Sequence, residues 1–251
     1  MGEILVALLV FFLLAAASLG CLVLHVKLPP HHRQDDTQAS IRLVASIFVV
    51  MTSLVLGLMI NTTKNKFDAI NRDVHTFATQ LILLDRTLRL YGPDASDTRQ
   101  RLHAYAQRAA NGKWTSDDPH TIADRTSEHL LTEVGNGLRA MQPADAERLS
   151  VWNDARQQLR SIVELRWALV EQAEGSIPTP LLVMLVAWLI LIFGSFGYRA
   201  PQNLVVVTTL VLSAALIAGT LYLILDLDGP FSGPIQISPA PLQRAFNEIK
   251  H

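Results

Sequence analysis

The amino-acid sequence predicts an all-helical membrane protein with four transmembrane helices and a soluble helical bundle inserted between the second and the third. Three observations support this fold class. Half of the 251 residues are hydrophobic, only 17% are charged, and the mean hydropathy is +0.28, which is too apolar for an ordinary soluble domain. Four runs without a charged residue are each near or above the roughly 18 residues that a membrane span requires. The long polar region between them has helical rather than alternating periodicity.

The four charge-free runs cover residues 4–26, 43–60, 181–198 and 204–225. The first is interpreted as a span and not as a cleaved signal peptide, because Glu3 stands where a signal peptide carries a positive charge and the run continues past the lone Cys21. We therefore expect the first two spans in residues 1–60, joined by a short polar loop at 27–42. The other two are expected in residues 178–225.

The second span is expected to continue as one helix from Arg42 to Tyr91. No proline occurs in this stretch and Gly57 is its only glycine, so nothing in it terminates a helix. After the span, apolar residues recur at a three-four spacing with charged residues between them. The apolar face is wider than a two-position seam because it also includes Ile82, Leu83 and Leu90. This width favours packing against the chain's own 144–174 helix over a coil between subunits.

Residues 61–177 are expected to form the soluble helical domain. Its first helix should stop at Gly92-Pro93, and a second should end near Gly112. Gly135-Asn-Gly137 is expected to be a weak point in the third helix, and Pro143 to start a fourth. About five residues separate the third span from the fourth, which predicts a tight hairpin. Residues 226–251 follow as a turn-rich tail with a short terminal helix.

Several classes of function lack the residues that they require. The net charge of −1 and the pI of 6.7 show no basic excess for nucleic-acid binding. We find no enzyme motif and expect no cofactor. The adjacent His31 and His32, with Asp35 and Asp36, lack the i, i+4 spacing that aims two rings at one metal. A metal site is therefore not expected.

A narrow strip of small and polar residues marks the second span, and it consists of Ser46, Val50, Ser53, Gly57 and Asn61. If several subunits placed this face on a common axis, the strip would line a pore. Val50 or Ile60 would then form an apolar constriction, and the hydroxyls or the Asn61 amide would contact the ion. The alternative is close helix packing, since Ser53-x-x-x-Gly57 is a small-xxx-small pattern.

Two carboxylates, Asp226 and Asp228, follow the fourth span. Repeated by symmetry around a pore mouth, they would form an acidic ring that concentrates cations. Alternatively, they end the helix and cap the Gly-Pro turn that follows. Both interpretations remain open at the level of the sequence.

The last quarter of the chain carries the most specific pattern. Its elements are Trp188, Phe193-Gly-Ser-Phe-Gly-x-x-Ala-Pro-x-Asn203 and Leu225-Asp-Leu-Asp-Gly-Pro-Phe-Ser-Gly-Pro-Ile-Gln-Ile-Ser-Pro-x-Pro-Leu242. This pattern, together with the order of spans, resembles the bacterial bestrophin-like family. The resemblance implies an inner-membrane homo-oligomer such as a pentamer, an ion-conducting pore, and a structural tail motif of Pro230, Phe231, Ser232 and Gly233. The expected partners are the lipid bilayer, other copies of the chain, and ions.

The orientation and the activity each have two candidates. Lys27, Arg33 and Arg42 in the first short loop favour a cytoplasmic loop and an external helical domain, although Lys64 and Lys66 closely follow the second span. The family resemblance instead implies a cytosolic helical domain. A channel is one functional hypothesis. The other is a non-conducting scaffold or sensor whose helical domain binds a protein or a ligand.

Overall fold

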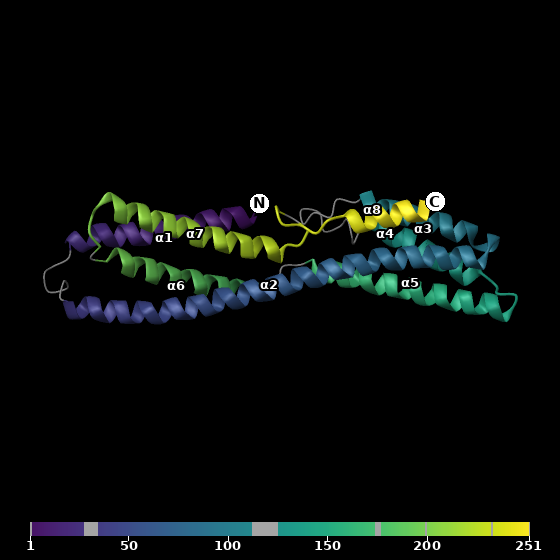
Figure 1. The fold of residues 1–251 in the computed structure, drawn as a ribbon, viewed down its shortest axis with the longest axis horizontal. Coiled ribbons are helices and arrows are strands. Elements are labelled where there is room, and N and C mark those ends of the chain that lie inside the picture. Colours follow the sequence, from purple (N-terminus) through teal and green to yellow (C-terminus); the bar gives the residue numbers. More distant parts are fainter. Residues whose placement is uncertain are drawn as a thin grey trace. The chain divides into compact units, whose positions relative to one another are not determined.

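The structure, a computed structural model, describes residues 2–27, 35–111, 125–173, 177–198, 200–231 and 233–250. Within these ranges all regular structure is helical (Figure 1). The elements are α1 (Gly2–Lys27), α2 (Asp35–Tyr91), the short 3-10 helix η2 (Pro93–Ala95), α3 (Ser96–Asn111), α4 (Arg125–Ala140), α5 (Ala146–Gln172), α6 (Thr179–Gly197), α7 (Leu204–Asp228) and α8 (Ala240–Lys250).

Four of these helices, α1, α2, α6 and α7, are long and apolar enough to cross a membrane, which confirms the prediction of four candidate spans. Within the most apolar window of each, only 17–28% of the residues are buried by the chain itself. Most of their apolar surface is therefore left for lipid or for another subunit.

The chain divides into two compact units. The span unit comprises Met1–Asn65 and Ser176–Asp228, and the bundle unit comprises Lys66–Gly175 and Gly229–His251. Helix α2 contributes its first half to the span unit and its second half to the bundle unit. Its length follows from its composition, because no proline and only one glycine interrupt the i→i−4 hydrogen bonds.

Three predicted boundaries are corrected. The loop expected at 27–42 is shorter, because α2 begins at Asp35. Helix α7 continues to Asp228, three residues beyond the charge-free run 204–225 and into the segment that was expected to be a turn-rich tail. Helix α5 begins at Ala146 and not at Pro143, because the Asp145 carboxylate caps it by accepting a 2.7 Å hydrogen bond from the backbone N–H of Arg148.

The span unit is held together by α1, which packs against both α6 and α7. Its buried core consists of Val10, Leu14, Met59, Leu185, Leu189, Phe193, Ala214, Leu221 and Ile224. Because lipid tails are as apolar as these side chains, close packing rather than the hydrophobic effect holds such helices together.

Two helices of this unit approach each other closely where Gly197 of α6 meets the backbone of Ser18 in α1. A Cβ atom at position 197 would overlap the Ser18 carbonyl oxygen and lie only 2.8 Å from its carbonyl carbon. One turn earlier, a Cβ at Gly194 would lie 3.4 Å from the Cys21 sulfur. The glycines of the Phe193-Gly-Ser-Phe-Gly motif therefore bring the two helices into contact.

The connection between α6 and α7 is short, because α6 ends at Gly197 and α7 begins at Leu204, and each of the two helices packs against α1. The Asn203 side chain caps α7, since its Oδ1 accepts a 2.8 Å hydrogen bond from the backbone N–H of Val206. The Gln202 amide donates to the carbonyl oxygen of Leu22 at 3.3 Å, which ties the hairpin to the end of α1.

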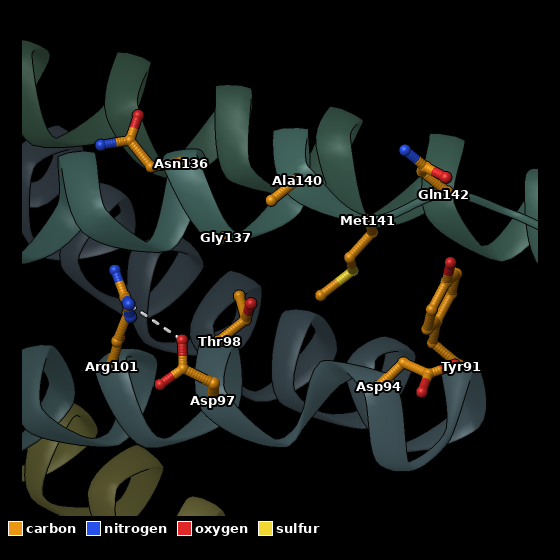
Figure 2. Close-up of a pocket in the computed structure, with 10 residues that line it drawn as sticks. All are labelled: Tyr91, Asp94, Asp97, Thr98, Arg101, Asn136, Gly137, Ala140, Met141 and Gln142. Atoms are coloured by element: carbon orange, nitrogen blue, oxygen red, sulfur yellow. Dashed lines mark ion pairs between the residues drawn. The ribbon is translucent and has the colours of Figure 1, made fainter.

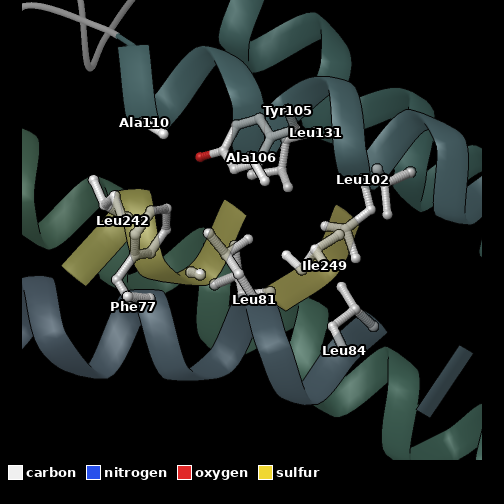
Figure 3. Close-up of a cluster of buried hydrophobic side chains, with 14 of the residues drawn as sticks. Phe77, Leu81, Leu84, Leu102, Tyr105, Ala106, Ala110, Leu131, Leu242 and Ile249 are labelled. Carbon is white, nitrogen blue, oxygen red and sulfur yellow. The ribbon is translucent and has the colours of Figure 1, made fainter. Parts of the chain in front are cut away.

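The bundle unit buries apolar side chains from the second half of α2 and from α3, α4, α5 and α8. Figure 3 shows part of this core, including Phe77, Leu81, Leu84, Leu102, Tyr105, Leu131, Leu242 and Ile249. Burial raises the pKa of the Tyr105 phenol, and the nearby Arg166 charge opposes this shift. The phenol therefore stays neutral at physiological pH.

Helix α5 lies antiparallel to the second half of α2 (Figure 1), as the sequence predicts. At one end, the Gln172 amide donates to the Asp73 carboxylate at 3.2 Å. At the other end, the Arg148 guanidinium lies 5.8 Å from the centre of the Tyr91 ring. The predicted width of the apolar face was overestimated, because Leu83 and Leu90 are 39% and 79% exposed.

A buried carboxylate links α2 to its neighbours in the bundle unit. Asp85 is only 2% exposed, and it accepts hydrogen bonds from Arg89 at 2.7 Å and from Arg99 at 2.9 Å. Arg89 also donates to the carbonyl oxygen of Ile249 near the end of α8, at 3.3 Å. The buried negative charge of Asp85 is thus paired with two arginines. Through Arg89, this pairing also connects the terminal helix α8 to α2.

Gly137, which the sequence suggested only as a weak point in the helix, also has a packing role. A Cβ at this position would overlap the Thr98 hydroxyl, so Gly137 allows α4 to approach α3 closely. Gly135 differs, because a Cβ there would make only an ordinary 3.5 Å contact with Leu159. Packing between α3 and α4 therefore requires one glycine of the pair and not the other.

Candidate functional site

The strip predicted on the second span lies on the exposed surface of the span unit. The residues Ser46, Val50, Ser53, Gly57, Ile60 and Asn61 are all exposed. The Ser46 hydroxyl donates a 2.7 Å hydrogen bond to the backbone carbonyl of Leu43 in its own helix. No part of the described chain covers this face.

A different face of the same segment packs against the rest of the span unit. Ala45, Thr52, Met59 and Thr63 are at most 7% exposed, and Phe48 lies 6.1 Å from the ring of Trp188 in α6. At roughly 100° per residue, this covered face points about 130° away from the strip. The strip is therefore free to meet water, lipid or another subunit.

The small-xxx-small pattern does not act within the chain. A Cβ added at Gly57 would meet nothing within 4 Å in the described structure, whereas a packing glycine leaves no such space. Close packing through Ser53 and Gly57 would thus need a second subunit. The choice between packing and pore lining therefore depends on whether other copies of the chain meet this face.

The two carboxylates near the end of α7 are buried rather than open to solvent. Asp226 is 2% and Asp228 is 6% exposed. Asp226 shares a side-chain hydrogen bond with Tyr222, one turn earlier in α7. The Asp228 carboxylate accepts a 3.2 Å hydrogen bond from the backbone N–H of Ile177, just before α6. This geometry favours the structural interpretation over an open acidic ring.

We expect Asp228→Ala to destabilise the span unit by about 1–3 kcal/mol, the cost of leaving a polar group without its partner in a partly buried place. Asp228→Asn keeps an acceptor oxygen and should cost clearly less. Thermal unfolding of the purified protein in detergent, followed by tryptophan fluorescence, measures the difference. An alanine variant that melts like the wild type but loses cation flux would instead support the acidic ring.

The tail motif that follows belongs to the bundle unit. Pro230 is buried, and its carbonyl oxygen accepts a 2.9 Å hydrogen bond from the backbone N–H of Ile237, which closes the turn. Phe231 is 4% exposed and joins the core of this unit. Gly233 has a φ of 80°, which disfavours residues with a side chain. Ser232 lies outside the described residues, as does the His31-His32 pair.

A polar cavity of about 480 Å³ in the bundle unit did not follow from the sequence (Figure 2). Arg101 lies on its wall and forms ion pairs with Asp97, at 2.9 Å, and with Glu133. Asp94 pairs with Arg148 at 3.1 Å. Tyr91, Asn136 and Met141 complete much of the lining. Such a wall can offer both donors and acceptors to a small polar molecule.

Comparison with models of known protein families shows which family the chain belongs to. The sequence model of the bestrophin-like domain matches residues 12–242. The chain belongs to the bestrophin-like family. The resemblance drawn from Trp188 and the two motifs of the last quarter is thus confirmed. Comparison with curated proteins gives no significant match.

Solved structures of bacterial bestrophin homologues share the fold of this bestrophin-like chain. A crystal structure of the Klebsiella pneumoniae homologue, solved by zinc SAD phasing, superposes with a TM-score of 0.69 over 96% of each chain, at 14% sequence identity. A single-residue variant of a Klebsiella pneumoniae homologue gives a TM-score of 0.70 at 14% identity, over 98% of this chain and 99% of that one. The arrangement of helices is shared despite the low identity.

Sequence reasoning missed several residues that organise this bestrophin-like chain. Gly197 was quoted only as part of a motif, although Ser18 lies directly against it. The spacing of Gly194 and Gly197 could have indicated a helix contact, because small residues allow close approach in membranes. The residues around the polar cavity come from α2, η2, α3, α4 and the segment after α4, and no local motif connects them.

Proposed function

We propose that this bestrophin-like protein is a homo-oligomeric ion channel of the bacterial inner membrane, with a pore lined by α2. The observation that supports the proposal most strongly is the uncovered strip from Ser46 to Asn61, which points away from the packed face of its own subunit. Family membership and four candidate spans support a channel-like membrane protein.

Arranged around an axis, the strips of several subunits would alternate small polar groups with apolar side chains. Ser53, Gly57 and Asn61 leave room and offer hydrogen-bonding groups to a passing ion, while Val50 or Ile60 narrows the path. Charged side chains are absent from the run 43–60, so an ion would meet neutral dipoles. A pentamer is the stoichiometry that the family resemblance suggests.

The bundle unit completes the proposed architecture as a soluble domain inserted between the second and third spans, with α2 entering it. Of the two orientations that the sequence allows, we propose a cytosolic bundle unit. Family membership supports this side, and Lys64 and Lys66 after the second span offset the basic residues of the first short loop.

Introducing charge at Ser53 tests whether the strip lines an aqueous path. We expect Ser53→Glu to raise and Ser53→Lys to lower the cation-to-anion permeability ratio. Each change should be on the order of tenfold, because a unit charge about 4 Å from an ion contributes roughly 1–4 kcal/mol. Reversal potentials of the reconstituted protein under a salt gradient measure the ratio.

Thr62 offers a matched control on the same helix, since it is exposed but lies roughly 150° from the strip at 100° per residue. Thr62→Glu and Thr62→Lys should leave the permeability ratio unchanged. Identical reversal potentials for the two Ser53 variants, with an intact oligomer, would contradict the pore. If the wild-type protein does not conduct ions at all, the channel proposal fails.

The second candidate function is that of a non-conducting membrane scaffold or sensor. The 480 Å³ polar cavity in the bundle unit favours it, because this cavity can admit a small molecule. Its ion-paired wall, with Arg101 held between Asp97 and Glu133, is suited to a ligand that carries both donors and acceptors. Absence of conductance together with ligand binding to this cavity would favour the sensor.

A further inference from the structure

A groove of about 630 Å³ lies between α2 and the end of α6 in the span unit. Its lining includes Ile41, Arg42, Val49, Phe196, Tyr198 and Pro201. The proposed channel mechanism assigns no role to Arg42 or to the α6 side of this groove.

The groove has apolar walls and a polar mouth. Of the two serines in its lining, Ser46 donates to the Leu43 carbonyl at 2.7 Å and Ser195 to the Ile192 carbonyl at 2.6 Å. Both hydroxyl protons are therefore engaged within their own helices. Arg42 and Tyr198 are the other residues with polar side chains in the lining.

The position of the groove along the spans matches the level of lipid headgroups. Arg42 directly precedes the charge-free run 43–60, and Tyr198 follows the last residue of α6. Arginine and tyrosine at span ends lie at the membrane interface. The apolar part of the groove, along Val49 and Phe196, then lies at the depth of the acyl chains.

We propose that this groove binds an anionic phospholipid. The Arg42 guanidinium would pair with the phosphodiester, because its planar donors match phosphate oxygens. One acyl chain would lie between α2 and α6, since a hollow at this depth loses dispersion contacts unless it is filled. Basic pockets between transmembrane helices recognise lipid headgroups in this way.

Charge favours a lipid over a second copy of the chain as the occupant. A neighbouring copy could neutralise Arg42 only with a carboxylate outside its four charge-free runs, whereas every anionic phospholipid carries its phosphate at this level. A second hollow of about 290 Å³ lies beside Phe48 and Leu191, and its lining contains no charged residue. That hollow therefore provides an internal comparison without a headgroup site.

The lipid site and the proposed pore can be tested separately. Ser46 and Val50 belong to both the groove wall and the strip, whereas Ser53, Gly57, Ile60 and Asn61 do not line the groove. A binding measurement on the purified full-length protein does not depend on conductance. The lipid proposal can therefore fail while the channel proposal stands, and the channel proposal can fail while the lipid proposal stands.

Native mass spectrometry of the detergent-purified protein, titrated with phosphatidylglycerol or phosphatidylcholine of identical chains, tests the site. The wild type should bind phosphatidylglycerol more tightly. Arg42→Gln should reduce this preference about tenfold, which is typical for one charge-assisted contact, and Arg42→Lys should retain most of it. Lys64→Gln removes a charge outside the groove and should change nothing.

Filling the groove gives a second, independent readout. Val49→Trp should weaken the binding of both lipids, whereas Leu191→Trp, in the second hollow, should leave the phosphatidylglycerol preference intact. Equal affinity of the wild type for the two lipids, or a preference that survives Arg42→Gln, would overturn the proposal. So would a disulfide-linked dimer that Val49→Cys forms and the wild type does not, because it would place a second copy against the groove.

Discussion

Replacing Gly197 by alanine should have the largest effect on the span unit, with loss of most of the folded, monodisperse protein. The added methyl group would overlap the backbone of Ser18, which is fully buried. A flexible side chain could rotate away, but a carbonyl group inside helix α1 cannot. We therefore expect a cost at or above the upper end of the roughly 1–3 kcal/mol seen for overpacked cores. Size-exclusion chromatography and thermal unfolding in detergent measure it.

Gly219 provides the matched control, because it also lies in a span helix but a Cβ there would meet nothing within 4 Å. Gly219→Ala should fold normally, helped by the higher helix propensity of alanine. A further Ser18→Ala change should not rescue Gly197→Ala, since the overlap involves the Ser18 backbone and not its hydroxyl. If Gly197→Ala behaved like Gly219→Ala, the proposed helix contact would be wrong.

Leu84→Ala should destabilise the bundle unit by about 2–5 kcal/mol, the usual cost of removing a fully buried leucine side chain. Leu84 is 0% exposed in the core (Figure 3), while its neighbour Leu83 is 39% exposed. Leu83→Ala should therefore cost well under half as much. Chemical denaturation, with the loss of helix followed by circular dichroism, measures the destabilisation in both variants.

The comparison of Leu83 with Leu84 also tests whether another copy of the chain packs against this helix. A large effect of Leu83→Ala, equal to that of Leu84→Ala, would mean that another subunit buries Leu83, as in a coil between copies. In that case the loss of stability should depend on protein concentration, because a contact between subunits obeys mass action. A concentration-independent difference between the two variants would assign the second half of α2 to the core of its own subunit.

The amino-acid sequence determined those features that depend on local composition. Charge-free runs of span length predicted the four apolar helices, and the lack of proline predicted a single long α2. Helical periodicity placed Phe77, Leu81, Leu84 and Leu88 on one face, and all four are buried in the bundle core. The motifs around Gly197 and Asp228 identified the family.

Local pattern failed where a feature depends on which helices meet. The sequence did not predict that Gly137 and Gly197 lie against other helices. A glycine within a helical pattern looks the same in the sequence whether or not another helix packs against it. By sequence Asp228 fitted either a pore mouth or a helix end, and its contact with the backbone of Ile177 favours the second interpretation. Leu83 and Leu90 fitted the apolar face by spacing but lie outside the core.

The strip on α2 has one property that the sequence predicted and one that only the tertiary structure decided. Its residues share a face because an α-helix turns by a fixed angle per residue, so the sequence alone predicted their alignment. Only the tertiary structure decided that this face stays uncovered while Ala45, Thr52 and Met59 pack inward. Helix periodicity is a local property of the backbone, whereas burial depends on where α1, α6 and α7 lie, and that follows from contacts between residues far apart in the chain.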